Sequence, residues 1–534
     1  MSDQQQPIDL RLSTTEQSRD VLLSPTQKEL SIHATPSPVR ASLNWIQTGL
    51  AGDVQGAGGL LGHLWRLIGR LLHTRLVKTY YWAVIPLIVI GAVQVNAHIY
   101  YNIFWGYDMP LHFDNTYAIL TTGNMPAPPD HPTAVYPYQP HGEAFQPELF
   151  YMLSAWAIEL GKLVIADPVA GFIPVFLLLI GMIWYWIICV LVQRFLKRTH
   201  PLLRALTVCV IMLPTGVIMA TAMFNNDLPV QVMSTLALLQ LWLMVRSGRT
   251  ADRRLWLRVA ALIGIGISFK TTGVVLAGIL FAFGGLLMAG NLYRRHYRTA
   301  RHLLTNMLIS LPLIALPYFA DLLHVSQYST AVSISGIGGY TSNDGGYGLS
   351  FVKFMTSFDS TALTNPVGDP GSGRGSAWSR LYATYFGDIY SFWFANPAKR
   401  YDRSPEALEA AHQSLIWAMP VAILIALGYL SALYRIIRHS RRAMRDGSTL
   451  IVVAATLALA ALLYQLISVQ SLGFFLSRYI LYIYPFLIVT GIFTVWQLAR
   501  NRRSLVIPLA KLGVWATLVV FCIAEISFVW LTPG

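Results

Sequence analysis

A short stretch beyond the first long apolar run is rich in groups that can exchange protons. FWGYDMPLHFDN carries Asp108, His112 and Asp114. A carboxylate partly shielded from water is a stronger base than one in bulk solvent, so such groups beside an apolar run could take part in proton transfer. Asp114 is equally typical of a solvated loop. The stretch indicates a functional site only if other polar groups lie at the same depth of the membrane.

Three further ionisable residues adjoin apolar runs in distant parts of the sequence: Asp227, Lys270 and Arg478. Each has a plainer interpretation. Asp227 could cap a helix, Lys270 could extend to the membrane surface, and Arg478 could be an interfacial anchor. Ionisable residues at membrane spans are rare and usually functional, so the topology must decide whether these three lie at one level.

Composition predicts a membrane protein. Of the 534 residues, 54% are hydrophobic and only 12% are charged, and the mean hydropathy is +0.50. A soluble chain of this size needs more charge to cover its surface. Long apolar stretches recur and predict an all-α, polytopic transmembrane protein with about 11–12 membrane helices and long first and late outer loops.

The net charge of +14 is concentrated in short segments between apolar runs. By the positive-inside rule these segments are cytoplasmic, so the charge indicates topology and no nucleic-acid partner. The N-terminus is then cytoplasmic and the C-terminus lies outside. The basic segments are 193–204, 246–258, 291–302, 434–445 and 499–504.

This topology divides the chain into regions and brings the ionisable residues to the outer side. Residues 148–165 are expected to begin and end outside, as an interfacial or re-entrant helix, while 257–290 form a hairpin whose turn carries Lys270. The predicted regions are a disordered cytoplasmic tail (1–57), an interfacial amphipathic helix (58–78), a transmembrane catalytic module (79–320) with an outer loop (102–147), a second outer region (321–411) and C-terminal transmembrane helices (412–534).

The motifs at these positions keep a recognisable order. In the first outer loop Asp108, His112, Gly123 and Pro126 precede QPELFY, and later segments read FNNDLP, GIGISFKTTG and RYILYIYP. This order resembles the GT-C superfamily of membrane glycosyltransferases, which includes protein O-mannosyltransferases and lipid A aminoarabinose transferases. The family has an acidic residue where this chain has Met109.

The resemblance implies a GT-C-like fold and inverting transfer of a hexose or pentose from a polyprenyl-phosphate donor. The acceptor, a lipid, glycan or protein, would bind on the outer side of a bacterial inner membrane. Asp108 and Asp227 would be catalytic and could hold a divalent metal ion; no other cofactor is implied. Substrate binding would fall to residues near them, namely His112, Asp114, Lys270, Arg478 and Tyr479. The aromatic segment YATYFGDIYSFWF (382–394) would cover the sugar.

Three alternatives remain open at this point. A transporter or flippase for a lipid-linked saccharide would place its site at the midplane between repeated halves, which the sequence does not display. An O-antigen-type polymerase or ligase would use arginines of the late outer loop, where Arg374, Arg380, Arg400 and Arg403 occur. Met109 leaves open a non-catalytic relative.

Overall fold

The computed structural model describes residues 79–100, 109–125, 146–326, 351–360, 376–387, 404–469, 476–500 and 506–531. Within these ranges all regular elements are helices. The predicted tail 1–57 and interfacial helix 58–78 lie outside the described residues. Most of the first outer loop does too, including Asp108.

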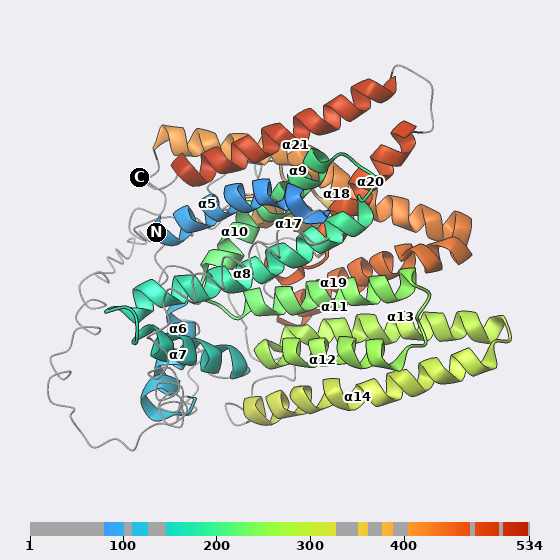
Figure 1. The fold of residues 1–534 in the computed structure, drawn as a ribbon, viewed down its shortest axis with the longest axis horizontal. Helices are drawn as coiled ribbons and strands as arrows, with labels where there is room; N and C mark the ends of the chain where they lie inside the picture. The colour runs from blue at the N-terminus through green and yellow to red at the C-terminus, as the bar shows by residue number, and fades with distance from the viewer. Residues whose placement is uncertain are drawn as a thin grey trace, which may run out of the picture. The chain divides into compact units, whose positions relative to one another are not determined.

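Eight of the described helices are long and apolar enough to cross a membrane. A bent pair, α9 (Pro201–Met212) and α10 (Thr215–Ala222), would make a ninth span. The sequence predicts about 11–12 membrane helices; α12 (Arg253–Phe269) and α20 (Tyr484–Arg500), each 17 residues long, are not among the eight. The eight are α5 (Val84–Tyr100) together with the 3-10 turn η3 (Tyr81–Ala83) before it, α8 (Pro168–Phe195), α11 (Asp227–Arg246), α13 (Val274–Tyr293), α14 (Tyr297–Ser326), α18 (Pro405–Asp446), α19 (Ser448–Val469) and α21 (Val506–Leu531) (Figure 1).

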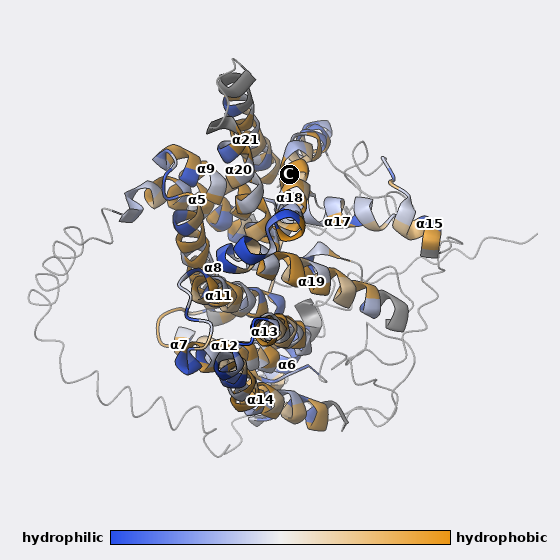
Figure 2. Ribbon diagram, turned by 90° about the vertical axis from the view of Figure 1, so that its right-hand side faces the viewer, coloured by the Kyte–Doolittle hydropathy of each residue, from blue (hydrophilic) through white to orange (hydrophobic). Residues whose placement is uncertain are grey.

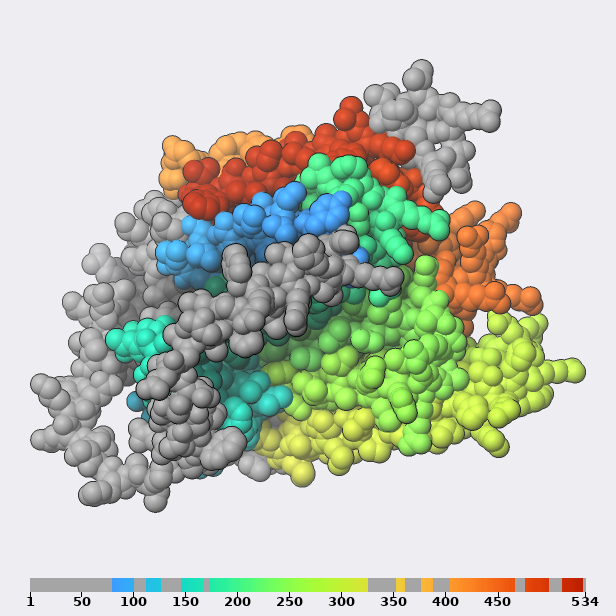
Figure 3. Space-filling view, viewed as in Figure 1, coloured from blue at the N-terminus to red at the C-terminus, as the bar shows by residue number. Residues whose placement is uncertain are grey.

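The helices present apolar side chains on their outward faces, as contact with lipid requires. Hydrophobic residues recur along α14 and α19 (Figure 2). On α14, Leu308, Leu316 and Leu323 are exposed, and the side chains of this helix form part of the surface in Figure 3. Hydrocarbon solvates such side chains at no cost, so their exposure fits a membrane bundle.

The two ends of the bundle differ. The short helices α6 (Met109–Thr122) and α7 (Leu149–Gly161) lie at one end, here called the outer end, and the connections from α11 to α12 and from α13 to α14 lie at the opposite end (Figure 1). Those connections carry basic residues such as Arg249 and Arg295. The arrangement therefore matches the predicted separation of polar loops from basic segments.

Helix α7 is too short to cross the membrane. Its 13 residues extend about 20 Å at 1.5 Å per residue, against roughly 30 Å of hydrocarbon. The helix packs against α6 and α8 at the outer end. This length supports the interfacial or re-entrant assignment of residues 148–165.

The span expected over 203–224 is not one straight helix. It bends by 66° between α9 and α10, because Pro214 lacks an amide hydrogen and its ring clashes with the preceding turn. After the bend, Gly216 lies against α17 (Ala377–Phe386): a Cβ at Gly216 would be 2.3 Å from the Thr384 carbonyl oxygen. The bend therefore brings α10 into backbone contact with the late outer region.

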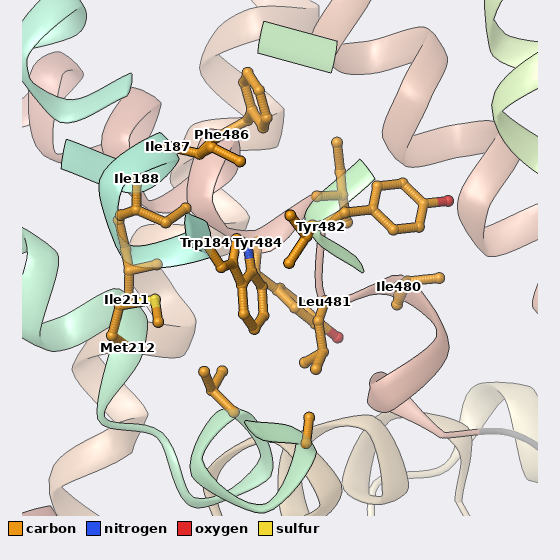
Figure 4. Packing of buried hydrophobic residues seen from close by; sticks show 14 of the residues in the cluster. Trp184, Ile187, Ile188, Ile211, Met212, Ile480, Leu481, Tyr482, Tyr484 and Phe486 are labelled. Atoms are coloured by element: carbon orange, nitrogen blue, oxygen red, sulfur yellow. The ribbon is translucent and has the colours of Figure 1, made fainter. Parts of the chain in front are cut away.

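Glycine also permits a close crossing of α18 and α20. A Cβ at Gly428 would lie 2.0 Å from the Leu487 carbonyl oxygen, and one at Gly491 would lie 2.1 Å from that of Leu424. Small residues at both helices let the backbones approach, as is common between membrane helices. The segment that leads into α20 is buried as well: Tyr482, Tyr484 and Phe486 pack near Trp184 (Figure 4).

The boundaries of the late outer region shift. Helix α14 continues to Ser326 and α18 already begins at Pro405, so both helices extend into the predicted range 321–411. The predicted hairpin is present: α12 ends at Phe269, a single 3-10 turn η4 (Thr271–Gly273) follows, and α13 begins at Val274.

Candidate functional site

A buried carboxylate at the outer end faces two cations. Lys270 Nζ donates a hydrogen bond of 2.8 Å to Asp227 Oδ1, and Arg478 Nε lies 3.8 Å from Asp227 Oδ2. The Asp227 side chain is 5% exposed, against 13% for Lys270 and 22% for Arg478. Three of the residues singled out in the sequence thus meet in one place, although they come from three separate parts of the chain.

Asp227 is not the cap of α11. The N-cap is Asn226, whose side chain makes no capping hydrogen bond. Asp227 is instead the first residue of the helix, and its backbone N–H donates to Asn225 Oδ1 at 2.9 Å. This local bond closes the turn between α10 and α11 and leaves the Asp227 carboxylate directed at the two cations.

Lys270 is held inside the site by its backbone. It follows α12 in an extended conformation, with φ −162° and ψ 136°, so its side chain leaves the direction of the helix. Burial by itself would lower the pKa of Lys270, but Asp227 more than offsets this and raises it above the ordinary 10.5. Lys270 therefore carries a positive charge at neutral pH and does not extend to the membrane surface.

Tyr479 lies against both cations. Lys270 Nζ is 5.5 Å from the centre of its ring and Arg478 Cζ is 5.0 Å from it. Arg478 also donates from Nη2 to the Tyr479 hydroxyl at 2.9 Å. An aromatic face attracts cations without neutralising them, so Tyr479 can hold both groups while leaving their charge available to an anion.

Gln231 positions the turn that carries Arg478. It lies one helical turn after Asp227 on α11 and is buried. Its amide Nε2 donates to the Arg478 carbonyl oxygen at 2.9 Å, and its Oε1 accepts from the Tyr482 N–H at 3.0 Å. Both hydrogen bonds fix the 3-10 turn η7 (Ser477–Ile480) and the residues after it against the helix of Asp227.

The late outer region contacts the same turn from the other side. Thr384 of α17 donates to the Ser477 hydroxyl at 3.0 Å and accepts from the Ser477 N–H at 3.1 Å. Nearby, Tyr385 and Phe386 are buried, and the Tyr385 ring packs on Tyr484 at 4.2 Å between centroids. These two aromatic residues of the expected sugar cover are packing residues; residues 388–394 of that segment lie outside the described part.

The described part of the first outer loop is the helix α6. His112 is buried in it, and its Nδ1 is 2.8 Å from the hydroxyl of Tyr151 on α7. The ring is near enough to Asp227 to interact with it electrostatically. Asp114 lies on α6 and is half-buried. The helix ends at Thr122, and the next residue, Gly123, has a φ of +79°, a conformation that glycine adopts without strain.

The structure describes Asp227 but not Asp108, and the surroundings of Asp227 do not suit the divalent metal ion considered for the two residues. Each carboxylate oxygen of Asp227 already faces a cation. Within the described ranges, no group of three or more His, Cys, Asp or Glu side chains is placed to hold an ion. Asp227 thus already has two cationic neighbours, and no step below passes through a metal.

Gln231 was not anticipated from the sequence, because it carries no charge and lies in an apolar segment. Tyr151 and Thr384 lie in segments that the sequence analysis named, QPELFY and YATYFGDIYSFWF, but their contacts were not predicted. The one signal for Gln231 is its spacing of four from Asp227, which places both on the same face of α11. Asn226 is also fully buried, and its Oδ1 has no hydrogen-bond partner within the described chain.

No protein-family model matches the chain, and no curated protein matches it in sequence. Similar solved structures include the archaeal oligosaccharyltransferase AglB from Archaeoglobus fulgidus in complex with an inhibitory peptide and a dolichol-phosphate, at 12% identity and a TM-score of 0.48 over 86% of this chain and 57% of that one. The apo form of the Archaeoglobus fulgidus oligosaccharyltransferase matches at 13% identity and 0.49 over 85% and 56%.

ArnT from Cupriavidus metallidurans bound to undecaprenyl phosphate is similar at 15% identity and a TM-score of 0.31, over 79% of this chain and 81% of that chain. AglB and ArnT are GT-C glycosyltransferases, the superfamily that the motifs resemble. The chain spans little more than half the length of the archaeal enzyme. Because every TM-score is below 0.5, the function proposed next is argued from the chain's own residues.

Proposed function

We propose that this protein is a glycosyltransferase that moves a sugar from a polyprenyl-phosphate donor to an acceptor on the outer side of the membrane. The observation that supports it is the pair of cations, Lys270 and Arg478, held by one buried carboxylate at the outer end. A lipid carrier requires the reacting phosphate to sit where membrane helices meet the aqueous side. The site's place at the end of the bundle where α6 and α7 lie supports this proposal.

The reaction needs the cations for its leaving group. The bond between the sugar's anomeric carbon and the phosphate oxygen breaks, and the polyprenyl phosphate leaves as an anion. Preorganised positive groups stabilise the charge that develops on that oxygen. Lys270 and Arg478 can do so because Asp227 and Tyr479 fix their positions before substrate arrives.

The attacking group must lose a proton as the new bond forms. An oxygen of the acceptor attacks the anomeric carbon from the face opposite the phosphate, which inverts its configuration, and a base takes the proton. Asp108 is proposed for this role from the order of motifs. Asp227 is engaged by its two cations, so we assign it to holding them. His112, beside Tyr151, is proposed to contact the substrate from the other side.

The donor can be tested with purified protein in nanodiscs. Undecaprenyl-phosphate glucose, mannose and arabinose serve as probes, and loss of the sugar-linked lipid and appearance of undecaprenyl phosphate are followed by mass spectrometry. Water is the acceptor in this assay, so wild type should slowly hydrolyse at least one donor to free sugar and undecaprenyl phosphate. Asp108→Asn should bind donors but not consume them, and Lys270→Met should lose both steps.

Lys162→Met is a matched control. Lys162 also lies towards the outer end, but it pairs with Glu159 in an exposed i, i+3 ion pair outside the site. Its substitution should leave donor consumption unchanged. If wild type binds donors, consumes none, and carries them across a bilayer, then a flippase or transporter replaces the proposed transferase.

A further inference from the structure

A fully buried carboxylate on the last helix joins two other helices. Glu525 is on α21 and is 0% exposed. Its Oε2 accepts a hydrogen bond of 3.0 Å from Thr215 Oγ1 on α10, and its Oε1 accepts one of 2.8 Å from Ser414 Oγ on α18. Both partners are neutral, and no cation of the described chain acts on Glu525. An ionisable residue inside a membrane bundle is rare and usually has a function.

The contact with α10 replaces a missing helix cap. Pro214 is the N-cap of α10 and makes no side-chain capping hydrogen bond. The first N–H groups of a helix lack partners within the helix and need acceptors from elsewhere. Glu525 supplies one, because Thr215, the first residue of α10, donates to it from its backbone N–H as well as from its hydroxyl. Glu525 therefore fixes the direction of α10 after the bend at Pro214.

The contact with α18 lies where that helix meets α17. Ser414 is buried, and its Oγ is also 3.4 Å from the Phe386 carbonyl oxygen at the end of α17. Beside it, the Tyr382 hydroxyl of α17 donates to the Leu415 carbonyl oxygen. Tyr382 is near enough to Glu525 to interact with it electrostatically. The carboxylate thus holds α18 at its junction with α17.

Both contacts lead to the turn that carries Arg478. On α10, Gly216 leaves no room for a side chain against the Thr384 carbonyl oxygen of α17. Thr384 in turn exchanges two hydrogen bonds with Ser477, which directly precedes Arg478 in η7. Helix α17 therefore contacts α10, α18 and η7, and it transmits the position of the first two to the third.

We infer that Glu525 is a positioning residue for Arg478: by joining α10 and α18 it holds α17, and α17 holds the turn that presents the Arg478 guanidinium to the donor's phosphate. The inference rests on the proposed function. A side chain with two terminal polar atoms is needed to join two helices, whereas capping α10 alone would need only one. Helix α21 thereby contributes to donor binding through other helices.

Donor affinity measures this role. The probe is an undecaprenyl-phosphate sugar (glucose, mannose or arabinose) bound to the full-length protein in nanodiscs, and wild type should bind at least one. Glu525→Leu removes both contacts and should weaken binding by about tenfold, the equivalent of two ordinary hydrogen bonds. Glu525→Gln should stay close to the wild-type affinity, because its amide oxygen can accept from Thr215 and its amide nitrogen can donate to Ser414.

Asn96→Leu is the matched control. The Asn96 side chain is buried on α5 and donates at 3.2 Å to the carbonyl oxygen of Val529, one turn beyond Glu525 on α21. Its substitution also removes a buried hydrogen bond to α21, but it should leave donor affinity unchanged. Thermal unfolding of each variant verifies folding. Ser414→Ala, which breaks only the contact with α18, should also weaken binding and replaces Glu525→Leu if that variant does not fold.

A double variant tests the route through Arg478. In the Arg478→Gln background, Glu525→Leu should cause little further loss of affinity, because the residue that it positions is gone. General damage to the bundle would instead add its full effect to that of Arg478→Gln.

The inference is overturned if Glu525→Leu keeps the wild-type affinity, if Glu525→Gln loses as much affinity as Glu525→Leu, or if the losses of Glu525→Leu and Arg478→Gln are additive. An equal loss in Asn96→Leu would also overturn it, since Glu525 would then only stabilise the packing of α21. A wild type that binds no donor overturns the proposed function itself, and with it this inference. The two failures are therefore distinguishable.

Discussion

Lys270 Nζ donates a hydrogen bond of 2.8 Å to the carboxylate of Asp227, which starts a different helix 43 positions earlier in the chain. Both side chains are largely shielded from solvent. Removing one partner of a buried ion pair leaves a charge without compensation, which costs more than the pair itself contributes. The pair therefore has both a structural and a functional role, and these can be separated experimentally.

Lys270→Met should lower the free energy of unfolding by on the order of 3 kcal/mol, since Asp227 then faces only the more distant Arg478. The double variant Asp227→Leu/Lys270→Met should recover part of that stability, because the buried carboxylate no longer lacks its nearer cation and Arg478, the more exposed of the two, keeps its hydrogen bond to Tyr479, but it should not recover donor binding. Thermal unfolding and lipid binding measure the two effects. Recovery of both would contradict a role for Lys270 in binding the phosphate.

Gln231→Leu should weaken binding of a polyprenyl-phosphate donor by about tenfold, because two hydrogen bonds that fix the Arg478 turn are lost. Ser234→Ala is a suitable control on the same helix: Ser234 is buried, and its hydroxyl has no hydrogen-bond partner among the described residues. Dissociation constants measured in nanodiscs test both. Equal effects of the two substitutions would indicate general damage to α11.

Gly428→Ala should destabilise the protein by on the order of 2 kcal/mol, because the added methyl group collides with the backbone of α20. In contrast, Gly513→Ala on α21 meets no atom within 4 Å and should be neutral or slightly stabilising. The unfolding temperature in detergent compares them. A neutral Gly428→Ala would mean that α18 and α20 separate more readily than their contact indicates.

Binding of a polyprenyl-phosphate sugar through Lys270 should not decline between neutral pH and pH 10. The folded-state pKa of Lys270 is raised above 10.5 by Asp227. Its contribution to stability is therefore fully present below the unfolded-state pKa and is lost only as the pH rises through the folded-state value. Lys270→His should instead lose affinity as the pH rises through about 6.5, the usual pKa of histidine. A loss of wild-type affinity below pH 9 would contradict a charged Lys270 in the site.

The sequence predicts that Asp227, Lys270 and Arg478 lie at the same end of the membrane helices, because the positions of charged residues along the chain indicate the topology. Basic segments indicate which turns lie on the same side, and ionisable groups beside apolar runs are conspicuous. The hairpin that carries Lys270 is likewise predictable from glycine and threonine in the middle of an apolar segment. The topology predicts which residues lie at the same end of the helices, but it does not predict the distances between those residues.

The contributions of neutral residues cannot be predicted in this way. Gln231 looks like any polar residue in a span until Arg478 and Tyr482 are placed beside it. Asp321 falls in a predicted loop because hydropathy declines before α14 ends, whereas the helix continues through packing against its neighbours. Element ends depend on tertiary contacts that no local pattern contains. Asp108 lies outside the described residues, so its role as base stays a prediction.

The contact between Asp227 and its two cations has a consequence for the kind of lipid phosphate that suits the site. The three described groups together carry one excess positive charge. A sugar linked through a single phosphate brings one negative charge, which the excess positive charge of these three groups offsets. A diphosphate carrier brings at least one more negative charge, and in a poorly hydrated environment that imbalance is costly. The charge of these three groups therefore favours the proposed monophosphate carrier over a diphosphate one.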